Sequence, residues 1–290
     1  MPSSRLSSFA PSATLTRRWA ALAAAAILGA AVQAEPVVMP AAEPAPTAAM
    51  AAYQAAQARW KSSLDAFAAA DKAQLPAAGG VLFVGSSTIR MWSSLAKDFR
   101  EQPVVINRGF GGSTMAECNL FVRDLVTRYK PRHVLVYAGD NDLAAGRSPI
   151  DVMHDFAQFA RTVREELPDT RISYISIKPS PSREGLLPKI RETNDIVAAY
   201  LRTQANTDYI DIFTPMMGGD GRPRAELFLP DRLHMNETGY KLWHGVIAAH
   251  VPATAAATPT MAAVRSPGAE GPMAAALPSV PVMAGASPRP

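Results

Sequence analysis

The chain has 290 residues and 48% of them are hydrophobic, so it can bury a sizeable core and is not disordered as a whole. Its 29 basic and 25 acidic residues give a net charge of +4, and Arg5, Arg17 and Arg18 lie in an N-terminal segment without acids. The remainder is nearly balanced in charge, which argues against a nucleic-acid-binding protein. Cys118 is the only cysteine, which excludes an intramolecular disulfide and a cysteine-based zinc cluster.

Residues 1–34 have the features of an export signal. Two arginines precede the apolar stretch 19–32, and small residues follow it before Glu35. Because the stretch is shorter than the about 18 residues needed to span a bilayer, a removable signal is favoured over a stable membrane anchor. We therefore expect a periplasmic or secreted protein that begins near Glu35, exported by the general or the twin-arginine route.

Segments poor in bulky side chains flank the body of the chain. Residues 35–47 are rich in Ala and Pro, which predicts a linker. Residues 252–290 are dominated by Ala, Pro, Ser and Met and contain no aromatic residue. Such a segment buries too little surface to offset its ordering entropy, so we expect a disordered tail.

A helical extension is predicted for residues 48–80. Between about residues 48 and 72, bulky side chains recur at intervals of three and four residues or their sums, which places them on one face of a helix. These residues are Tyr53, Trp60, Leu64 and Phe67. We expect this face to pack on the main domain.

Residues 81–251 alternate short strand-like runs with amphipathic segments and form the predicted catalytic domain. The five runs, rich in β-branched and aromatic residues, are 81–84, 104–106, 134–137, 172–175 and 209–212. Helical patterns lie at about 89–99, 113–129, 150–166, 187–203 and 237–250. This alternation predicts an α/β fold with a five-stranded parallel sheet covered by helices on both faces.

Ligands bind beyond the carboxyl ends of the strands in such a sheet, and four of the five exits carry suggestive residues. They are Gly85-Ser86-Ser87-Thr88, residues 107–114, Gly139-Asp140-Asn141-Asp142, and Asp231-Arg232-Leu233-His234. Each has a structural explanation when taken alone, as a turn or a helix cap. Together they place an alcohol, a glycine N–H, an amide and an Asp-x-x-His pair at one edge, which favours a catalytic site.

The residue types match nucleophilic attack on an ester. A serine hydroxyl such as that of Ser87 needs a base, and the imidazole of His234 is suited to accept its proton near pH 7. Asp231, three residues earlier, can orient that imidazole. If the first strand lies between the second and third, the Ser87 N–H, the Gly112 N–H and the Asn141 side-chain amide would form an oxyanion hole.

These blocks resemble those of the SGNH hydrolases, also called the GDSL esterase and lipase family. The four name-giving residues are matched by Ser87, Gly112, Asn141 and His234, with Asp231 beside the histidine. The likeness spans about residues 81 to 250.

Two assignments within the likeness have alternatives. The usual Gly-Asp-Ser of the family is Gly-Ser-Ser here, and its register favours Ser87 over Ser86 as the nucleophile. Gly109 and Gly111 neighbour Gly112, which the count from the preceding strand favours.

The resemblance implies a flavodoxin-like, three-layer α/β/α fold and hydrolysis of carboxylic esters through an acyl-enzyme, without a metal or other cofactor. Gly-Ser-Ser with the nearby Trp92 is most similar to the acetylhydrolase-like branch, which implies short acyl or acetyl groups. Expected substrates are small esters, with acetylated carbohydrate and lysophospholipid as candidates. Trp92 itself we expect in the core.

Other functions remain as alternatives: a lysophospholipase or thioesterase of the same family, or a noncatalytic glycan-binding module on the same fold. Nucleotide binding is disfavoured, because Thr114 stands where a Gly-x-Gly-x-x-Gly motif needs its last glycine. The proline-rich segment 178–184 is predicted either to shape the pocket or to be a rigid surface connection.

Overall fold

The computed structural model describes residues 47–252. The predicted export signal, linker and C-terminal tail lie outside these residues, apart from Thr47 and Pro252 at the two boundaries. Among the described residues, none of the helices is both long enough and apolar enough to cross a membrane.

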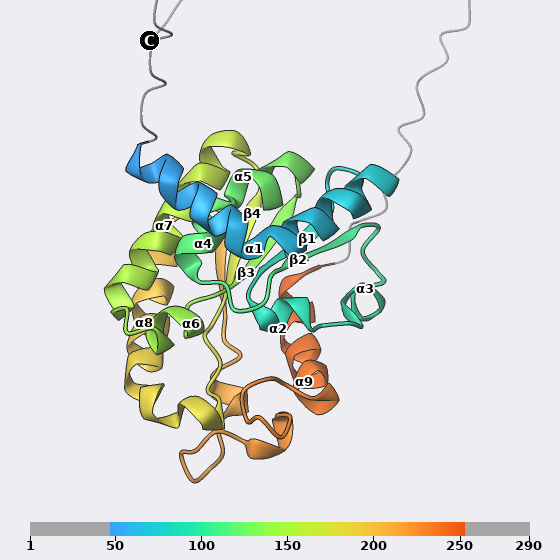
Figure 1. Ribbon diagram of the computed structural model, residues 1–290. Coiled ribbons are helices and arrows are strands. Elements are labelled where there is room, and N and C mark those ends of the chain that lie inside the picture. The colour runs from blue at the N-terminus through green and yellow to red at the C-terminus, as the bar shows by residue number, and fades with distance from the viewer. Residues whose placement is uncertain (1–46, 253–290) are drawn as a thin grey trace, which may run out of the picture. The chain divides into compact units, whose positions relative to one another are not determined.

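Five parallel strands form one sheet in the order β2-β1-β3-β4-β5, which confirms the predicted fold class (Figure 1). The strands are β1 (Val81–Gly85), β2 (Val105–Gly109), β3 (His133–Tyr137), β4 (Arg171–Ile175) and β5 (Thr207–Ile210). The first strand lies between the second and the third, as the predicted oxyanion hole requires. The chain winds first to one side of β1 and then to the other, and such a switch point is where parallel sheets bind ligands.

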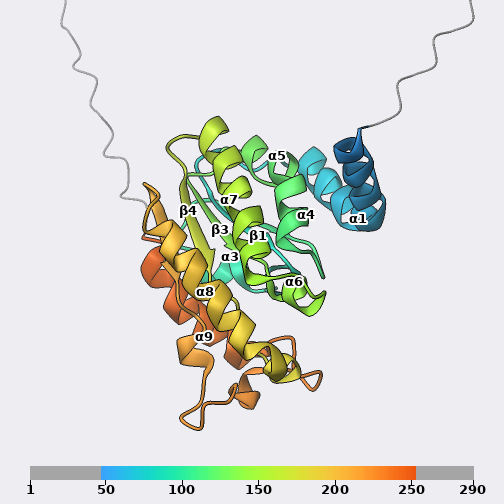
Figure 2. The same ribbon diagram turned by 90° about the vertical axis from the view of Figure 1, so that its left-hand side faces the viewer.

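Alternate side chains of each strand enter separate hydrophobic cores on the two faces of the sheet. In β1, Leu82 and Val84 belong to the first core, whereas Val81 and Phe83 belong to the second. All residues of β1 and β3 are buried, so the centre of the sheet is covered on both sides. The molecule is therefore a three-layer α/β/α structure (Figure 2).

Two groups of helices cover the two faces. The first core is packed by α1 (Ala48–Ala73), α4 (Met115–Leu120), α5 (Val122–Leu125), α6 (Asp140–Ala144), α7 (Pro149–Glu166) and α8 (Leu187–Leu201). The second is packed by α2 (Ser87–Arg90), α3 (Leu95–Asp98) and α9 (Glu237–Ile247). Short 3₁₀ helices are η1 (Thr127–Tyr129), η2 (Pro181–Leu186), η3 (Thr214–Met216), η4 (Ala225–Leu227) and η5 (Ala248–His250).

Two predicted helices are wrong in their continuity. The pattern at 113–129 forms three short pieces, α4, α5 and η1, with nonhelical backbone at Phe121 and Val126. Both side chains are fully buried, so their packing in the core outweighs the preference of the segment for a continuous helix at these two residues. The pattern at 89–99 forms α2 and α3, which are separated at the buried Trp92.

Helix α1 follows the predicted face and is fixed to the sheet layer along its length (Figure 1). Near its start, the Tyr53 hydroxyl donates to Asp124 over 2.7 Å. Near its end, Asp71 forms an ion pair of 2.6 Å with Arg108 of β2, and both side chains are less than one-tenth exposed. These contacts set the position of the middle of α1, which reaches the active-site edge.

Candidate active site

Ser87 is presented at the first position of α2, immediately beyond β1. Gly85 has φ +143°, and a Cβ there would lie 1.8 Å from the Tyr137 carbonyl oxygen of β3, so only glycine fits. Ser86 precedes the helix as its N-cap residue and is fully buried. Ser87 is partly exposed and its side chain faces His234.

Three side chains form a hydrogen-bonded chain at this edge. Ser87 Oγ lies 3.0 Å from His234 Nε2, across 147 residues of sequence. His234 Nδ1 lies 2.7 Å from Asp231 Oδ2. An ionised carboxylate only accepts hydrogen bonds, so Nδ1 carries the proton and Nε2 presents its lone pair to the hydroxyl.

Asp231 is held as a carboxylate by its own turn. Its Oδ1 accepts from the backbone N–H groups of Leu233, over 2.9 Å, and His234, over 3.0 Å. The hydrogen bond from the His234 ring, followed by these backbone bonds, lowers the pKa of Asp231 to about 2. The group is therefore ionised at neutral pH.

The chain reverses sharply between the aspartate and the histidine. Arg232 has φ +58°, a left-handed conformation that is uncommon for arginine. The Leu229 N–H donates to the His234 carbonyl over 2.7 Å and closes the turn. The closed turn places the side chains of Asp231 and His234, three residues apart in sequence, on the same side of the turn.

Two backbone N–H groups at this edge have no hydrogen-bond acceptor among the described residues. Phe110 to Ser113 form a turn with Gly112 at its third position and φ +82°, which glycine adopts readily. Neither the Gly112 N–H nor the Ser87 N–H donates to any group within residues 47–252. Of the neighbouring glycines, Gly111 also lines the site, whereas Gly109 lies within β2.

The Asn141 side chain has one fixed orientation. Its Nδ2 donates to the Ser113 carbonyl over 2.9 Å, and its Oδ1 accepts from Arg183 Nη2 over 2.8 Å. A carbonyl only accepts and a guanidinium only donates, so the amide cannot be reversed. The second hydrogen on Nδ2 remains for another acceptor.

Arg183 belongs to a buried charged cluster that sequence reasoning missed. Its Nη1 pairs with Asp140 Oδ2 over 3.0 Å, and Lys178 Nζ reaches the same oxygen over 3.1 Å. Burial acts to raise the pKa of Asp140, but the charges of Lys178 and Arg183 outweigh burial and hold that pKa below its ordinary value. Arg183 thus contacts a lining residue of the groove, although no residue of segment 178–184 lines the groove itself, so both predicted roles of the segment stay predictions.

A groove of about 530 Å³ is lined by four of the five predicted site residues, all except Asp231. Its lining includes Ser87, Gly111, Gly112, Asn141, Leu233 and His234, together with Arg90 at the end of α2. The remaining lining comes from α1 and consists of Arg59, Trp60, Ser62 and Ser63. The prediction that α1 only packs on the domain was therefore incomplete.

A model of the GDSL-like lipase/acylhydrolase family matches residues 77–242, more than half of the chain. The chain belongs to this family. The resemblance seen in the sequence is confirmed, and the protein is an ester hydrolase. A search of curated proteins by sequence finds no match.

Three solved structures share the fold of this GDSL-like hydrolase. A Streptococcus pneumonia protein, provisionally described as a platelet activating factor, has TM-score 0.60 and 17% identity, covering 71% of this chain and 100% of its own. A provisionally described acylhydrolase from Bacteroides fragilis has TM-score 0.55 and 21% identity, with coverage of 62% and 91%. A GDSL-like lipase from Bacteroides thetaiotaomicron has TM-score 0.53 and 22% identity, with coverage of 59% and 86%.

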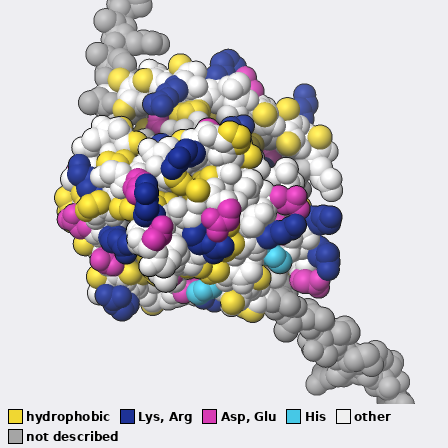
Figure 3. Space-filling model, turned by 90° about the horizontal axis from the view of Figure 1, so that it is seen from below, with side chains coloured by type: hydrophobic (Ala, Val, Ile, Leu, Met, Phe, Trp, Pro, Cys, Tyr) yellow, Lys and Arg dark blue, Asp and Glu magenta, His cyan; other side chains and the backbone are white. Residues whose placement is uncertain are grey.

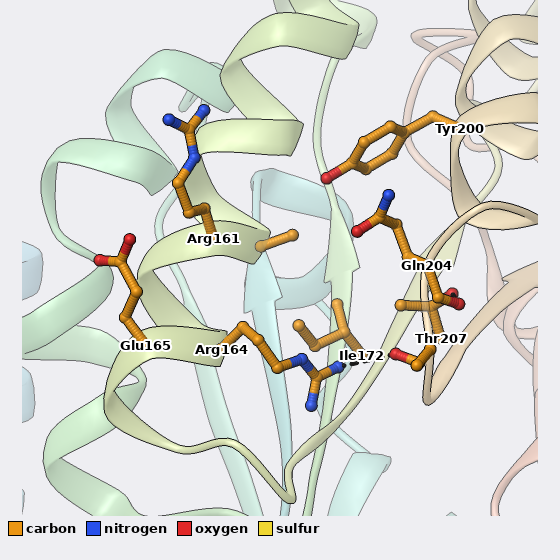
Figure 4. Close-up of a pocket in the computed structure, with 9 residues that line it drawn as sticks. Arg161, Arg164, Glu165, Ile172, Tyr200, Gln204 and Thr207 are labelled. Carbon is orange, nitrogen blue, oxygen red and sulfur yellow. Dashed lines mark hydrogen bonds between the residues drawn. The ribbon is translucent and has the colours of Figure 1, made fainter.

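A second hollow in this GDSL-like hydrolase, of about 480 Å³, lies between α7 and α8 (Figure 4). Ile172 and Thr207 mark it at the beginnings of β4 and β5, opposite the carboxyl ends where Ser87 lies. Arg161, Arg164 and Glu165 line it from α7, and among the described residues its lining has no serine or histidine. This hollow therefore has no serine–histidine pair like the one beyond β1.

Other candidate side chains of the GDSL-like hydrolase have structural partners. Trp92 is 1% exposed and donates to Asp98 over 2.7 Å, so it belongs to the core as expected. His133 is buried in β3 and lies 2.7 Å from Ser173 Oγ. The face drawn in Figure 3 intersperses basic with acidic side chains.

Proposed function

We propose that the protein is a serine esterase whose nucleophile is Ser87. His234 Nε2 takes the hydroxyl proton while Oγ attacks the acyl carbon, and Asp231 stabilises the imidazolium that forms. The negative oxygen of the tetrahedral intermediate accepts from the N–H groups of Ser87 and Gly112 and from Asn141 Nδ2. The intermediate collapses, the ester C–O bond breaks, and His234 returns the proton to the departing alcohol.

Water completes the cycle. His234 takes a proton from a water molecule that attacks the acyl-enzyme carbon, and a second tetrahedral intermediate forms. Its collapse releases the carboxylic acid and returns the proton to Ser87 Oγ. The observation that carries this proposal is the 3.0 Å contact between Ser87 Oγ and an imidazole whose other nitrogen lies 2.7 Å from a carboxylate.

We propose short acyl groups, acetyl foremost, as the acyl part. Within residues 47–252, Trp60 and Leu233 are the only large apolar side chains that line the groove, which offers little surface for a long hydrocarbon chain. This lining disfavours the alternative of a lysophospholipase that acts on long acyl chains. The likeness of Gly-Ser-Ser and Trp92 to the acetylhydrolase-like branch points the same way.

Hydrolysis of p-nitrophenyl acetate by the purified protein tests the proposal. We expect Ser87→Ala and His234→Ala to lose at least about a thousandfold in kcat while their circular dichroism spectra stay unchanged. Ser86→Ala is the matched control, because it removes the adjacent buried hydroxyl and should retain activity. Full activity in Ser87→Ala would remove Ser87 as the nucleophile, and inactivity of the wild type on all esters tried would favour the noncatalytic glycan-binding alternative.

We also propose export with cleavage before Glu35, supported by the arginines and the short apolar stretch of the first 34 residues. The mass of the protein recovered from the periplasm or medium tests this. A product that retains its first 34 residues in the membrane fraction would contradict it.

A further inference from the structure

Helix α1 adds to the active-site groove from outside the segment that defines the family. The family match begins at residue 77, whereas α1 ends at Ala73. Four lining residues nevertheless come from α1, including Arg59 and Trp60. The part of the groove that α1 forms therefore lies outside the segment that the family model matches.

Trp60 forms an aromatic wall next to the proposed oxyanion hole. Its Cη2 atom would lie 3.5 Å from a Cβ at Gly112, which is ordinary van der Waals contact. Its ring meets Phe110 edge to face at 5.5 Å and 82°. The guanidinium of Arg59 lies 4.8 Å from the centre of the Trp60 ring.

Arg90 brings a second positive charge to the same groove. It lies three residues after Ser87 on α2, and its Nε would be 2.6 Å from a Cβ at Gly111, so its side chain crosses the glycine turn. Arg90 is exposed, and its side chain forms no ion pair or hydrogen bond within residues 47–252.

In the part of the chain that the structure describes, the groove lining contains two arginines and no carboxylate. Two nearby acids already have partners, since Glu117 pairs with Arg59 over 3.2 Å and Asp231 holds His234. The Arg59 side chain is still 61% exposed, so its guanidinium can bind a further anion. The uncompensated charge in the groove is that of Arg90.

We infer that this site takes esters whose alcohol part carries an anionic oxygen group, a carboxylate or a phosphate. This inference rests on the proposed function, the hydrolysis of short acyl esters. Since an acetyl group carries no charge, the anionic group must belong to the alcohol part of the ester. Arg90 binds the anion with Arg59 as the second guanidinium, and both can form charge-assisted, bidentate hydrogen bonds. Trp60 covers the ring or carbon skeleton of the alcohol.

Matched acetate esters test this inference. The probes are 4-acetoxybenzoate and 4-acetoxyphenyl phosphate as anionic esters and 4-acetoxybenzamide as the neutral ester of similar shape. We expect Arg90→Gln to lower kcat/KM for at least one anionic ester by about ten- to hundredfold, mainly through KM, with less than about twofold change for the amide. Arg59→Gln should act in the same direction but more weakly, because Glu117 shares its charge.

Arg161→Gln is the control. Arg161 lines the second hollow, so its replacement should not change the ratio of kcat/KM for the anionic esters to kcat/KM for the neutral ester. The anionic ester that suffers the larger loss identifies the group as carboxylate or phosphate. An anionic-to-neutral ratio within about twofold of wild type in the Arg59→Gln, Arg90→Gln double variant would overturn the inference. Failure of the proposed function gives a different result, namely that Ser87→Ala still hydrolyses the neutral ester.

Discussion

Arg183 holds the side-chain amide of Asn141 in one orientation, because its Nη2 donates to Asn141 Oδ1 over 2.8 Å. The amide nitrogen is turned toward the Ser113 carbonyl and the groove as a consequence. In the proposed mechanism this orientation prepares one of the three oxyanion donors before the substrate arrives. A donor that is already oriented needs no reorganisation in the transition state, and losing one typically costs about 2.7 to 4 kcal/mol.

Arg183→Met should therefore lower kcat for p-nitrophenyl acetate by about tenfold or more and leave KM within about twofold, because the donor acts on the transition state. Arg183→Lys should restore part of the rate. Arg222→Met is a matched control, since Arg222 forms an exposed ion pair with Glu184 of the same segment. Equal kcat values for the two methionine variants would show that Arg183 does not position the amide.

Gly85→Ala should prevent normal folding. The added Cβ would lie 1.8 Å from the Tyr137 carbonyl oxygen, and both strands are central to the sheet. We expect a loss of more than about 4 kcal/mol in the free energy of unfolding, measured with urea. Gly146→Ala is the control, because Gly146 also has positive φ but open space around it, and should lose only about 1 kcal/mol. Similar losses in the two variants would contradict the steric argument.

The sequence predicts the edge of the sheet well because its signals there are local. A buried run followed by a turn places Ser87 and Asn141 beyond β1 and β3, and the Asp-x-x-His spacing needs only one turn of chain. The roles of Trp60 and Arg183 had no such signal. Arg183 meets its amide partner from 42 residues away, and Trp60 looks like any apolar residue on a helix face. Only the packing of α1 and η2 against the edge reveals them.

Asp140 and Lys178 form a buried pair whose members depend on each other. Both side chains are at most 6% exposed and their charged atoms lie 3.1 Å apart. Lys178→Met removes one of the two cations facing Asp140, and Asp140→Asn leaves two cations without a carboxylate. Each single variant should lose about 3 kcal/mol or more in the free energy of unfolding.

The double variant, Asp140→Asn with Lys178→Met, should be less destabilised than the sum of the two single changes, because it leaves no unpaired lysine. Urea unfolding of the four proteins measures the coupling. Additive losses would mean that the two charges do not stabilise each other.

Asp142 gives the fold a pH dependence of a definite sign. Both of its carboxylate oxygens accept from the Met115 N–H at the start of α4, over 3.0 Å. Burial raises the pKa of Asp142 from 3.8 to about 6 in spite of these bonds. The folded protein thus keeps this proton up to about pH 6, whereas the unfolded chain releases it near pH 4. The preference of the folded state for protonated Asp142 stabilises the protein fully below about pH 4, and this stabilisation is lost as the pH rises from about 4 to about 6.

Asp142→Asn should therefore stabilise the protein at pH 7.5 by about 1 to 3 kcal/mol, because the amide oxygen still accepts from Met115 and carries no buried charge. The gain should vanish near pH 4, where wild-type Asp142 is neutral. Asp151→Asn should show the opposite pH dependence. Hydrogen bonds with Ser148 lower the pKa of Asp151, so its carboxylate stabilises the folded protein at neutral pH and this stabilisation is lost as the pH falls. Urea unfolding of the three proteins at both pH values measures these effects. A loss of stability for Asp142→Asn that is equal at pH 4 and pH 7.5 would show that the carboxylate is not destabilised by burial.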